Sequence, residues 1–185
     1  MSRAVLSIGS NLGNRLSHLQ SAVDRFRPWL RAVSGVYETA PWGPVPQAEY
    51  LNATVVVDDP AADADEWLRR AHAAEAAAGR RRDVRFGPRT LDVDLVDVDG
   101  RSCTGPELTL PHPRAAERAF VLVPWLEVDP AAILVGHGPV PAVVAALPPA
   151  ELDGVRLRAD LCLRTGGPPA SVSAATPVST PGTDG

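Results

Sequence analysis

The hydrophobic pattern of the chain predicts an α+β sandwich, an antiparallel sheet covered by two helices. Segments that alternate every two residues, as strands do, and segments with the 3.6-residue repeat of amphipathic helices follow one another along the sequence. Their order is strand, helix, strand, strand, helix, strand. This is the βαββαβ order of the ferredoxin-like fold, in which both helices lie on one face of the sheet. The fold hosts many functions, so it decides no activity.

Length and composition suit one globular domain. The chain has 185 residues, of which 45% are hydrophobic, and a net charge of −4. Negative charge argues against bulk attraction to nucleic acid or an anionic membrane. No apolar run approaches the roughly 18 residues that span a bilayer, and the first residues lack the pattern of a cleavable leader. We therefore expect a cytoplasmic monomer that acts on small molecules.

The composition also sets the expected domain limits. Residues 1–165 form the predicted domain, with extra C-terminal elements after the βαββαβ unit, and the Pro/Ser/Thr/Gly-rich tail 166–185 is expected to be disordered because it has too little apolar content to fold. Cys103 and Cys162 lack a metal-binding spacing. We expect both to be small buried residues.

The first third of the chain predicts a strand, a helix and a second strand. Residues 4–8 are apolar and end at a glycine-containing turn, 9–14, which contacts phosphate or is an ordinary turn. Apolar residues three or four apart then predict a helix over 16–30, with Asn14 as its N-cap. Residues 32–39 predict the second strand.

A proline-rich loop separates the second strand from the third. Three prolines and a glycine exclude regular structure over 40–47. Trp42 in this loop is either a packing anchor or an aromatic lid over a ligand. In the strand predicted over 50–57, Tyr50 and Asn52 share one face. An aromatic ring beside an amide suits a flat heterocycle, although a half-exposed sheet face explains the pattern equally well.

The second helix is predicted over 63–78. Asp63 and the glutamate three residues later form a capping pattern, and Gly79 ends the helix. His72 and Glu75 lie three residues apart and so share a face, which on its own reads as an ordinary polar side.

Two carboxylates follow on a predicted strand. Asp92 and Asp94 share one face, with Arg89 beside them and further arginines upstream. Mg²⁺ is usually held by one or two carboxylates plus substrate phosphates, and arginines bind phosphate, so this set suits phosphoryl transfer. The alternative is a solvated edge strand. Strict alternation would turn Asp97 inward, so the strand bulges there or the carboxylate is paired.

The C-terminal part contains one further candidate side chain. His112 lies between two prolines, which predicts a rigid extended segment. The apolar residues 119–127 predict a short helix or a buried segment, 138–147 a surface helix, and 155–163 a peripheral strand.

Several short motifs, in this order, resemble the 6-hydroxymethyl-7,8-dihydropterin pyrophosphokinases of folate biosynthesis. Each motif is weak alone, but the ordered set is specific. The matching positions are 7–15, 37–39, 41–43, 50–52, Glu75, Gly79, Arg80, 87–94, 110–114, Arg118 and Phe120.

The resemblance implies transfer of the pyrophosphoryl group of ATP to the hydroxymethyl oxygen of the reduced pterin, with release of AMP. It implies two Mg²⁺ ions held by Asp92 and Asp94, and two loops, 41–42 and 80–86, that close over the substrates. The catalytic residues would be Arg80, Arg89 and Asp94. The ATP-binding residues would be His72, Glu75, Arg82, Arg89, Leu95, Thr109, His112 and Arg118. The pterin-binding residues would be Thr39, Pro41, Trp42, Tyr50, Asn52 and Phe120.

Two other classes of protein remain alternatives. A non-catalytic nucleotide- or RNA-binding module shares the βαββαβ order, but the exposed aromatic pattern of RNA-recognition domains is missing and the net charge is negative. A kinase or hydrolase that cleaves ATP at the γ-phosphate would in its P-loop form carry a Walker A motif, which the sequence lacks.

Overall fold

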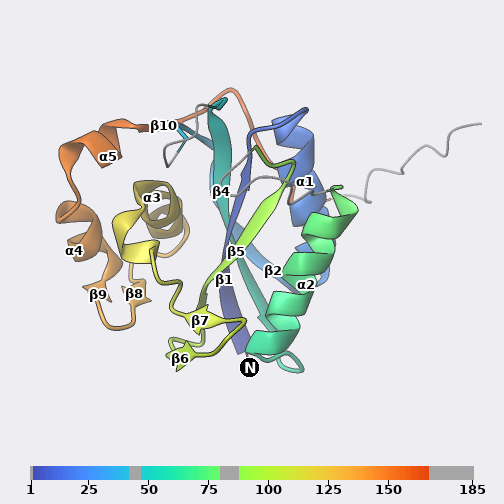
Figure 1. Cartoon of the computed structure of the whole chain (residues 1–185), viewed down its shortest axis with the longest axis vertical. Helices are drawn as coiled ribbons and strands as arrows, with labels where there is room; N and C mark the ends of the chain where they lie inside the picture. The colour runs from blue at the N-terminus through green and yellow to red at the C-terminus, as the bar shows by residue number, and fades with distance from the viewer. Residues whose placement is uncertain (1, 42–46, 80–87, 167–185) are drawn as a thin grey trace, which may run out of the picture.

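The computed structural model describes residues 2–41, 47–79 and 88–166 (Figure 1). Trp42, Arg80 and Arg82 lie outside the described residues, as does the tail from residue 167. The strands are β1 (Ser2–Ser10), β2 (Leu30–Val33), β3 (Tyr37–Thr39), β4 (Tyr50–Asp59), β5 (Asp92–Val98), β6 (Cys103–Thr104), β7 (Thr109–Leu110), β8 (Ile133–Leu134), β9 (Gly138–Pro139) and β10 (Val155–Leu157). The α-helices are α1 (Arg15–Phe26), α2 (Ala64–Ala77), α3 (Ala119–Val128), α4 (Val140–Ala145) and α5 (Pro149–Asp153).

The main sheet confirms the predicted fold. Its strand order is β10-β3-β4-β1-β5, with β2 also pairing β4, and every pairing is antiparallel. The predicted strand 32–39 is two short strands, β2 and β3, because the backbone turns aside between them. There Ser34 exchanges hydrogen bonds with Thr54, and the N–H of Gly35 donates to the Glu127 carboxylate at 3.0 Å.

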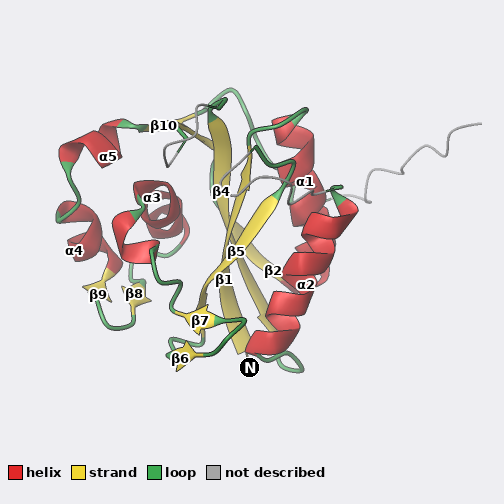
Figure 2. Ribbon diagram, viewed as in Figure 1, coloured by secondary structure: helices red, strands yellow, loops and turns green. Residues whose placement is uncertain are grey.

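Helices cover both faces of the sheet (Figure 2). The predicted pair, α1 and α2, packs on one face over a large apolar core that includes Leu6, Phe26 and Trp67. The C-terminal helices lie across the other face, where Val96 and Trp125 belong to a second, smaller core. Within the described ranges, no helix is long and apolar enough to cross a membrane.

The predicted helix starts are confirmed, but the first predicted helix is too long, because α1 ends at Phe26, a 3-10 turn follows and Leu30 begins β2. Asn14 caps α1 by accepting a hydrogen bond from the N–H of Ser17, at 3.1 Å. Asp63 caps α2 through the N–H of Glu66, at 2.8 Å. The Glu66 carboxylate does not complete a capping box, because it binds Arg69 and Arg70 instead.

Further sequence predictions are wrong. The peripheral strand predicted over 155–163 ends at Leu157, as β10. Cys103 and Cys162 are exposed rather than buried. Cys103 belongs to the β6–β7 ribbon, which pairs outside the main sheet, and so no core covers it. The segment around His112 is a turn rather than an extended strand, since the His112 carbonyl accepts a hydrogen bond from the N–H of Ala115 and a 3-10 turn follows.

Asp97 lies at a β-bulge. The pairing of β5 with β1 steps from Leu95 opposite Leu6 to Asp97 opposite Val5, so one extra residue interrupts the alternation. The carboxylate is buried, and one of its oxygens accepts a hydrogen bond from the N–H of Gly100 at 3.0 Å. The bulge that the sequence left open is therefore present, whereas the carboxylate is only half satisfied, because its other oxygen, Oδ1, is buried with no hydrogen-bond partner among the described residues.

The buried Asp97 carboxylate predicts an unusual dependence of stability on pH. Burial raises the pKa of Asp97, and the negative charge of Asp99 adds to the rise. A raised folded-state pKa means that the charged form costs stability above that pKa, and the cost disappears as pH falls below the unfolded-state value. The difference in the free energy of unfolding between Asp97→Asn and wild type should favour the variant more at pH 7 than at pH 4. Denaturant unfolding at both pH values measures this, and an equal difference at both would contradict it.

Candidate active site

A pocket of about 100 Å³ opens on the sheet face that faces α3, near the ends of β1, β4 and β5. It gathers predicted site residues from distant parts of the sequence. Its lining residues are Ser7, Gly9, Thr39, Ala40, Gln47, Tyr50, Asn52, Arg89, Asp92, Asp94, Arg118 and Phe120.

One wall combines aromatic and amide groups. Asn52 is buried and donates from Nδ2 to the Thr39 hydroxyl at 2.7 Å. Tyr50, two residues earlier on β4, shares this face, and Phe120 approaches from the start of α3. Because Tyr50 and Asn52 line a pocket with Phe120, the geometry favours a heterocycle site over a merely half-exposed sheet face.

The floor of the pocket is the end of β1. Gly9 pairs with Asn52 on one side and Asp92 on the other. A Cβ at Gly9 would lie 2.8 Å from Oδ1 of Asn52, so glycine is what lets the amide lie over the strand. The sequence analysis placed Gly9 in a turn after the strand, whereas Gly9 lies inside β1. Ser7, Gly9, Ala40 and Gln47 were not among the predicted site residues, although the resemblance to the family included 7–15.

The opposite wall carries the two acids. Asp92 forms an ion pair with Arg89, and its side chain is 17% exposed. One Asp94 oxygen lies 3.4 Å from an Arg118 nitrogen and 3.8 Å from Nε2 of His112. β5 is an edge strand of the main sheet, as the alternative supposed, and the Asp94 side chain is 34% exposed. Both carboxylates nevertheless line the pocket beside arginines, which distinguishes them from a merely solvated face.

Burial and charge set the protonation of the basic groups. Burial, with the positive charge of Arg118, lowers the pKa of His112 to about 4, so its imidazole is neutral at pH 7. Burial also lowers the pKa of Arg118, against the opposing pull of Asp94. For Arg89, the charge and hydrogen bond of Asp92 outweigh burial and raise the pKa. Both guanidiniums stay charged.

Asn11 fixes the backbone on which Arg89 stands. Its N–H donates to the Arg89 carbonyl at 3.1 Å, and its Oδ1 accepts from the Arg89 N–H at 2.8 Å. The Asn11 amide nitrogen also donates to Gln47 Oε1 and to the Ala48 carbonyl, at 2.9 and 3.2 Å. One buried side chain therefore joins the two segments that flank the pocket.

Several predicted nucleotide residues lie away from this pocket. The Glu75 carboxylate is buried and accepts from the N–H of Val93 at 2.9 Å, so it braces β5 and does not share the exposed polar side on which His72 lies. Leu95 is 4% exposed and packs in the helix-side core, which leaves only its backbone for contact with ATP. Thr109 lies on β7.

The acids fit a hard divalent cation. Carboxylate oxygens are the protein ligands that Mg²⁺ prefers, and such ions are commonly held by one or two of them together with phosphate oxygens. Within residues 2–41, 47–79 and 88–166, no group of three or more His, Cys, Asp or Glu side chains could hold a metal ion by itself.

The class is that of a ferredoxin-like protein with a pocket in which an aromatic and amide wall faces two carboxylates paired with arginines. Comparison gives the family. The model of the family "7,8-dihydro-6-hydroxymethylpterin-pyrophosphokinase (HPPK)" matches residues 5–130. The chain belongs to this family of ATP-using pyrophosphoryl transferases.

Curated relatives carry the name 2-amino-4-hydroxy-6-hydroxymethyldihydropteridine pyrophosphokinase. The protein from Mycobacterium tuberculosis is 50% identical over 169 residues, covering 85% of this chain and 90% of the relative. That from Methylorubrum extorquens is 38% identical over 159 residues, covering 84% and 99%.

The solved structures that resemble the chain are longer proteins. Plasmodium falciparum HPPK-DHPS with pteroate matches with a TM-score of 0.62 and 13% identity, over 78% of this chain and 44% of that chain. The chain thus spans less than half of that protein. At this identity the likeness shows the fold alone.

Proposed function

We propose that the protein transfers the pyrophosphoryl group of ATP to the hydroxymethyl oxygen of 6-hydroxymethyl-7,8-dihydropterin, giving the pterin diphosphate and AMP. The observation that carries this proposal is the pocket itself, in which an aromatic and amide wall faces two carboxylates paired with arginines. Family membership and the names of the relatives support the same reaction.

The acceptor would bind at the aromatic wall. Tyr50 and Phe120 would hold the pterin ring between them, since flat rings gain from stacked contact. The Asn52 amide, oriented by the Thr39 hydroxyl at 2.7 Å, would hydrogen-bond the polar edge of the ring. We also place Pro41 and Trp42 in the acceptor site. They belong to one of the two loops that we propose to close over the substrates.

The donor would bind at the acid wall. Asp92 and Asp94 would hold two Mg²⁺ ions, which when bound neutralise triphosphate charge and polarise the phosphorus under attack. Arg89, with Arg80, would stabilise charge that develops on the phosphates, while Arg118, Arg82 and His112 bind the nucleotide. His72 and Thr109 are proposed as outer contacts. Glu75 and Leu95 would act through the backbone of β5.

We propose that the protein acts as a monomer with residues 1–165 as its domain. The described residues that line the pocket all fall within these limits. Asp94 is also a candidate for accepting the hydroxyl proton, since it stands on the acid wall that faces the proposed acceptor site.

The nucleotide product tests the proposal. The protein is incubated with ATP and Mg²⁺, with and without the reduced hydroxymethylpterin, and the products are separated by chromatography. We expect AMP and pterin diphosphate in equal amounts, only when the pterin is present. ADP as the product would point to a γ-phosphate kinase, and binding without turnover to a non-catalytic module. Either result refutes the proposal.

A further inference from the structure

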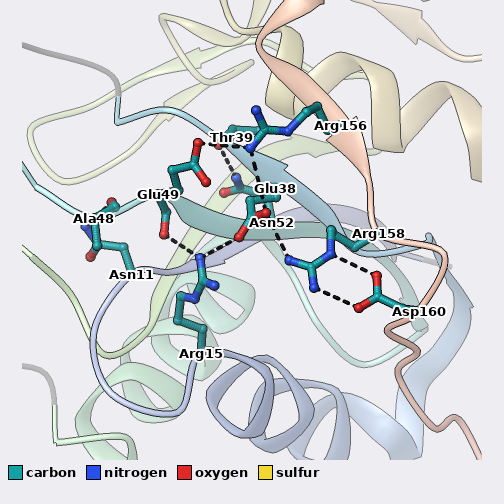
Figure 3. A network of polar contacts seen from close by, with 10 residues as sticks. All are labelled: Asn11, Arg15, Glu38, Thr39, Ala48, Glu49, Asn52, Arg156, Arg158 and Asp160. Carbon is teal, nitrogen blue, oxygen red and sulfur yellow. Dashed lines mark hydrogen bonds and ion pairs between the residues drawn. The ribbon is translucent and has the colours of Figure 1, made fainter.

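Glu38 is the centre of a polar cluster behind the acceptor wall (Figure 3). It lies on β3 beside the pocket residue Thr39, and its side chain is 13% exposed. Arg15, at the start of α1, places a nitrogen 3.0 Å from one Glu38 oxygen. Arg158 and Arg156, from the C-terminal segment, approach the other oxygen at 2.9 and 3.7 Å. Three guanidiniums from two distant parts of the chain thus meet on one carboxylate.

The same arginines reach the far end of the connection between β3 and β4. Arg15 donates to the Glu49 carbonyl at 2.8 Å, and Arg156 donates to the Glu49 carboxylate at 2.9 Å. Thr39 and Tyr50, the pocket residues at the two ends of this connection, are paired across the strands. The cluster therefore holds both ends of the connection between β3 and β4, next to the pocket residues Thr39 and Tyr50.

The arginines of the C-terminal segment are themselves firmly placed. β10 pairs with β3, and the N–H of Arg158 donates to the Val36 carbonyl at 2.8 Å. Further on, Gln20 on α1 exchanges hydrogen bonds with the Arg164 backbone, at 2.8 and 3.0 Å. The segment is a strap from the edge of the sheet to α1. It lies outside residues 5–130, which the family model matches.

A second cavity connects the C-terminal elements with the acceptor wall. Its volume is about 120 Å³, and it borders Thr39 and Phe120 on the side away from the acids. The other side of this cavity comes from α5 and the start of β10, including Gly154 and Val155. Among the described residues that line this cavity are Thr39 and Phe120 but neither Asp92 nor Asp94, so the C-terminal elements border the proposed acceptor wall and not the acid wall.

We propose that residues 155–160 are a positioning element for the acceptor, in which Arg156 and Arg158 hold Glu38 and Glu49 and thereby fix Thr39 and Tyr50. This inference rests on the proposed function. A single exposed ion pair contributes little to stability, but this cluster shares its carboxylates among several guanidiniums and joins three segments. Its loss should loosen the acceptor wall and leave β5, with its acids, in place.

Arg158→Gln and Glu38→Gln test the proposal on the full chain. We expect the KM for the pterin to rise about five- to tenfold, while kcat and the KM for ATP change less than twofold. Hydrogen exchange followed by mass spectrometry should show faster exchange at residues 37–41 and 47–52, and unchanged exchange at 92–98. A merely structural role would instead lower activity towards both substrates in step with thermal stability.

Arg31→Gln is the matched control, since it removes an arginine–carboxylate pair, Arg31 with Asp58 at 2.7 Å, from the same sheet but away from the pocket. It should leave both KM values unchanged. Unchanged pterin KM in both test variants overturns the inference, and so does an effect equal to that of the control. The wild-type protein is assayed first. If it forms no pterin-dependent AMP, the proposed function is refuted, and this outcome is distinct from a failure of the inference about residues 155–160.

Discussion

Replacing Asp94 by asparagine is expected to lower kcat for pterin-dependent AMP formation by about a thousandfold, a magnitude typical of losing a principal electrostatic group at a reaction centre. The side chain is 34% exposed, contacts Arg118 and His112 across the pocket, and packs in neither apolar core. Its loss therefore removes a charge from the site and no core contact. Steady-state kinetics at saturating ATP and Mg²⁺ measure the effect, and calorimetry should show a change in Tm of no more than a few degrees.

Asp129→Asn is the control for Asp94. Asp129 is also a partly exposed carboxylate paired with an arginine, Arg3 at 3.1 Å, but it lies outside the pocket. The control should keep wild-type kcat. If Asp94→Asn retained a tenth of the wild-type rate, the negative charge of Asp94 would be essential neither for metal binding nor for proton transfer. If Asp94 binds Mg²⁺, raised Mg²⁺ should restore part of the lost rate, because a weakened metal site fills at higher concentration.

The local part of the site could be predicted from the sequence. Two-residue alternation is a property of the strand itself, so the common face of Asp92 and Asp94, and that of Tyr50 and Asn52, follow from spacing alone. All four residues line the pocket. Alternation failed at Asp97 because the bulge there is set by pairing with β1, a partner about 90 residues earlier in the chain.

The remainder of the site depends on contacts between distant segments. The space above Gly9 matters only because the Asn52 side chain crosses it, and the link from Asn11 to Arg89 spans 78 positions. The role of the buried Glu75 likewise depends on a distant partner, the backbone N–H of Val93 on β5. Hydrophobic periodicity carries no information about contacts between distant segments. The resemblance to a family nevertheless included several of these positions.

Arg89→Ala is expected to lower kcat by a hundred- to a thousandfold, with less than a tenfold loss of ATP affinity. The backbone of Arg89 is held on both sides by Asn11, so truncation of the side chain leaves the chain path in place. What disappears is a charged guanidinium in the pocket wall, paired with Asp92 and available to charge that develops on the transferring phosphates. Single-turnover kinetics and equilibrium ATP binding separate the two quantities.

Arg27→Ala provides the comparison for Arg89. Arg27 pairs with Asp24 at the same three-residue separation and with similar exposure, 22% against 28%, but it lies at the end of α1, outside the pocket. The control should lose stability at most. Equal losses of ATP affinity and of rate in Arg89→Ala would make the guanidinium a binding anchor, because a group that contacts ground state and transition state alike changes both quantities together. A loss confined to the rate would place its action in the transition state, where the acids and arginines of this wall meet the transferring group.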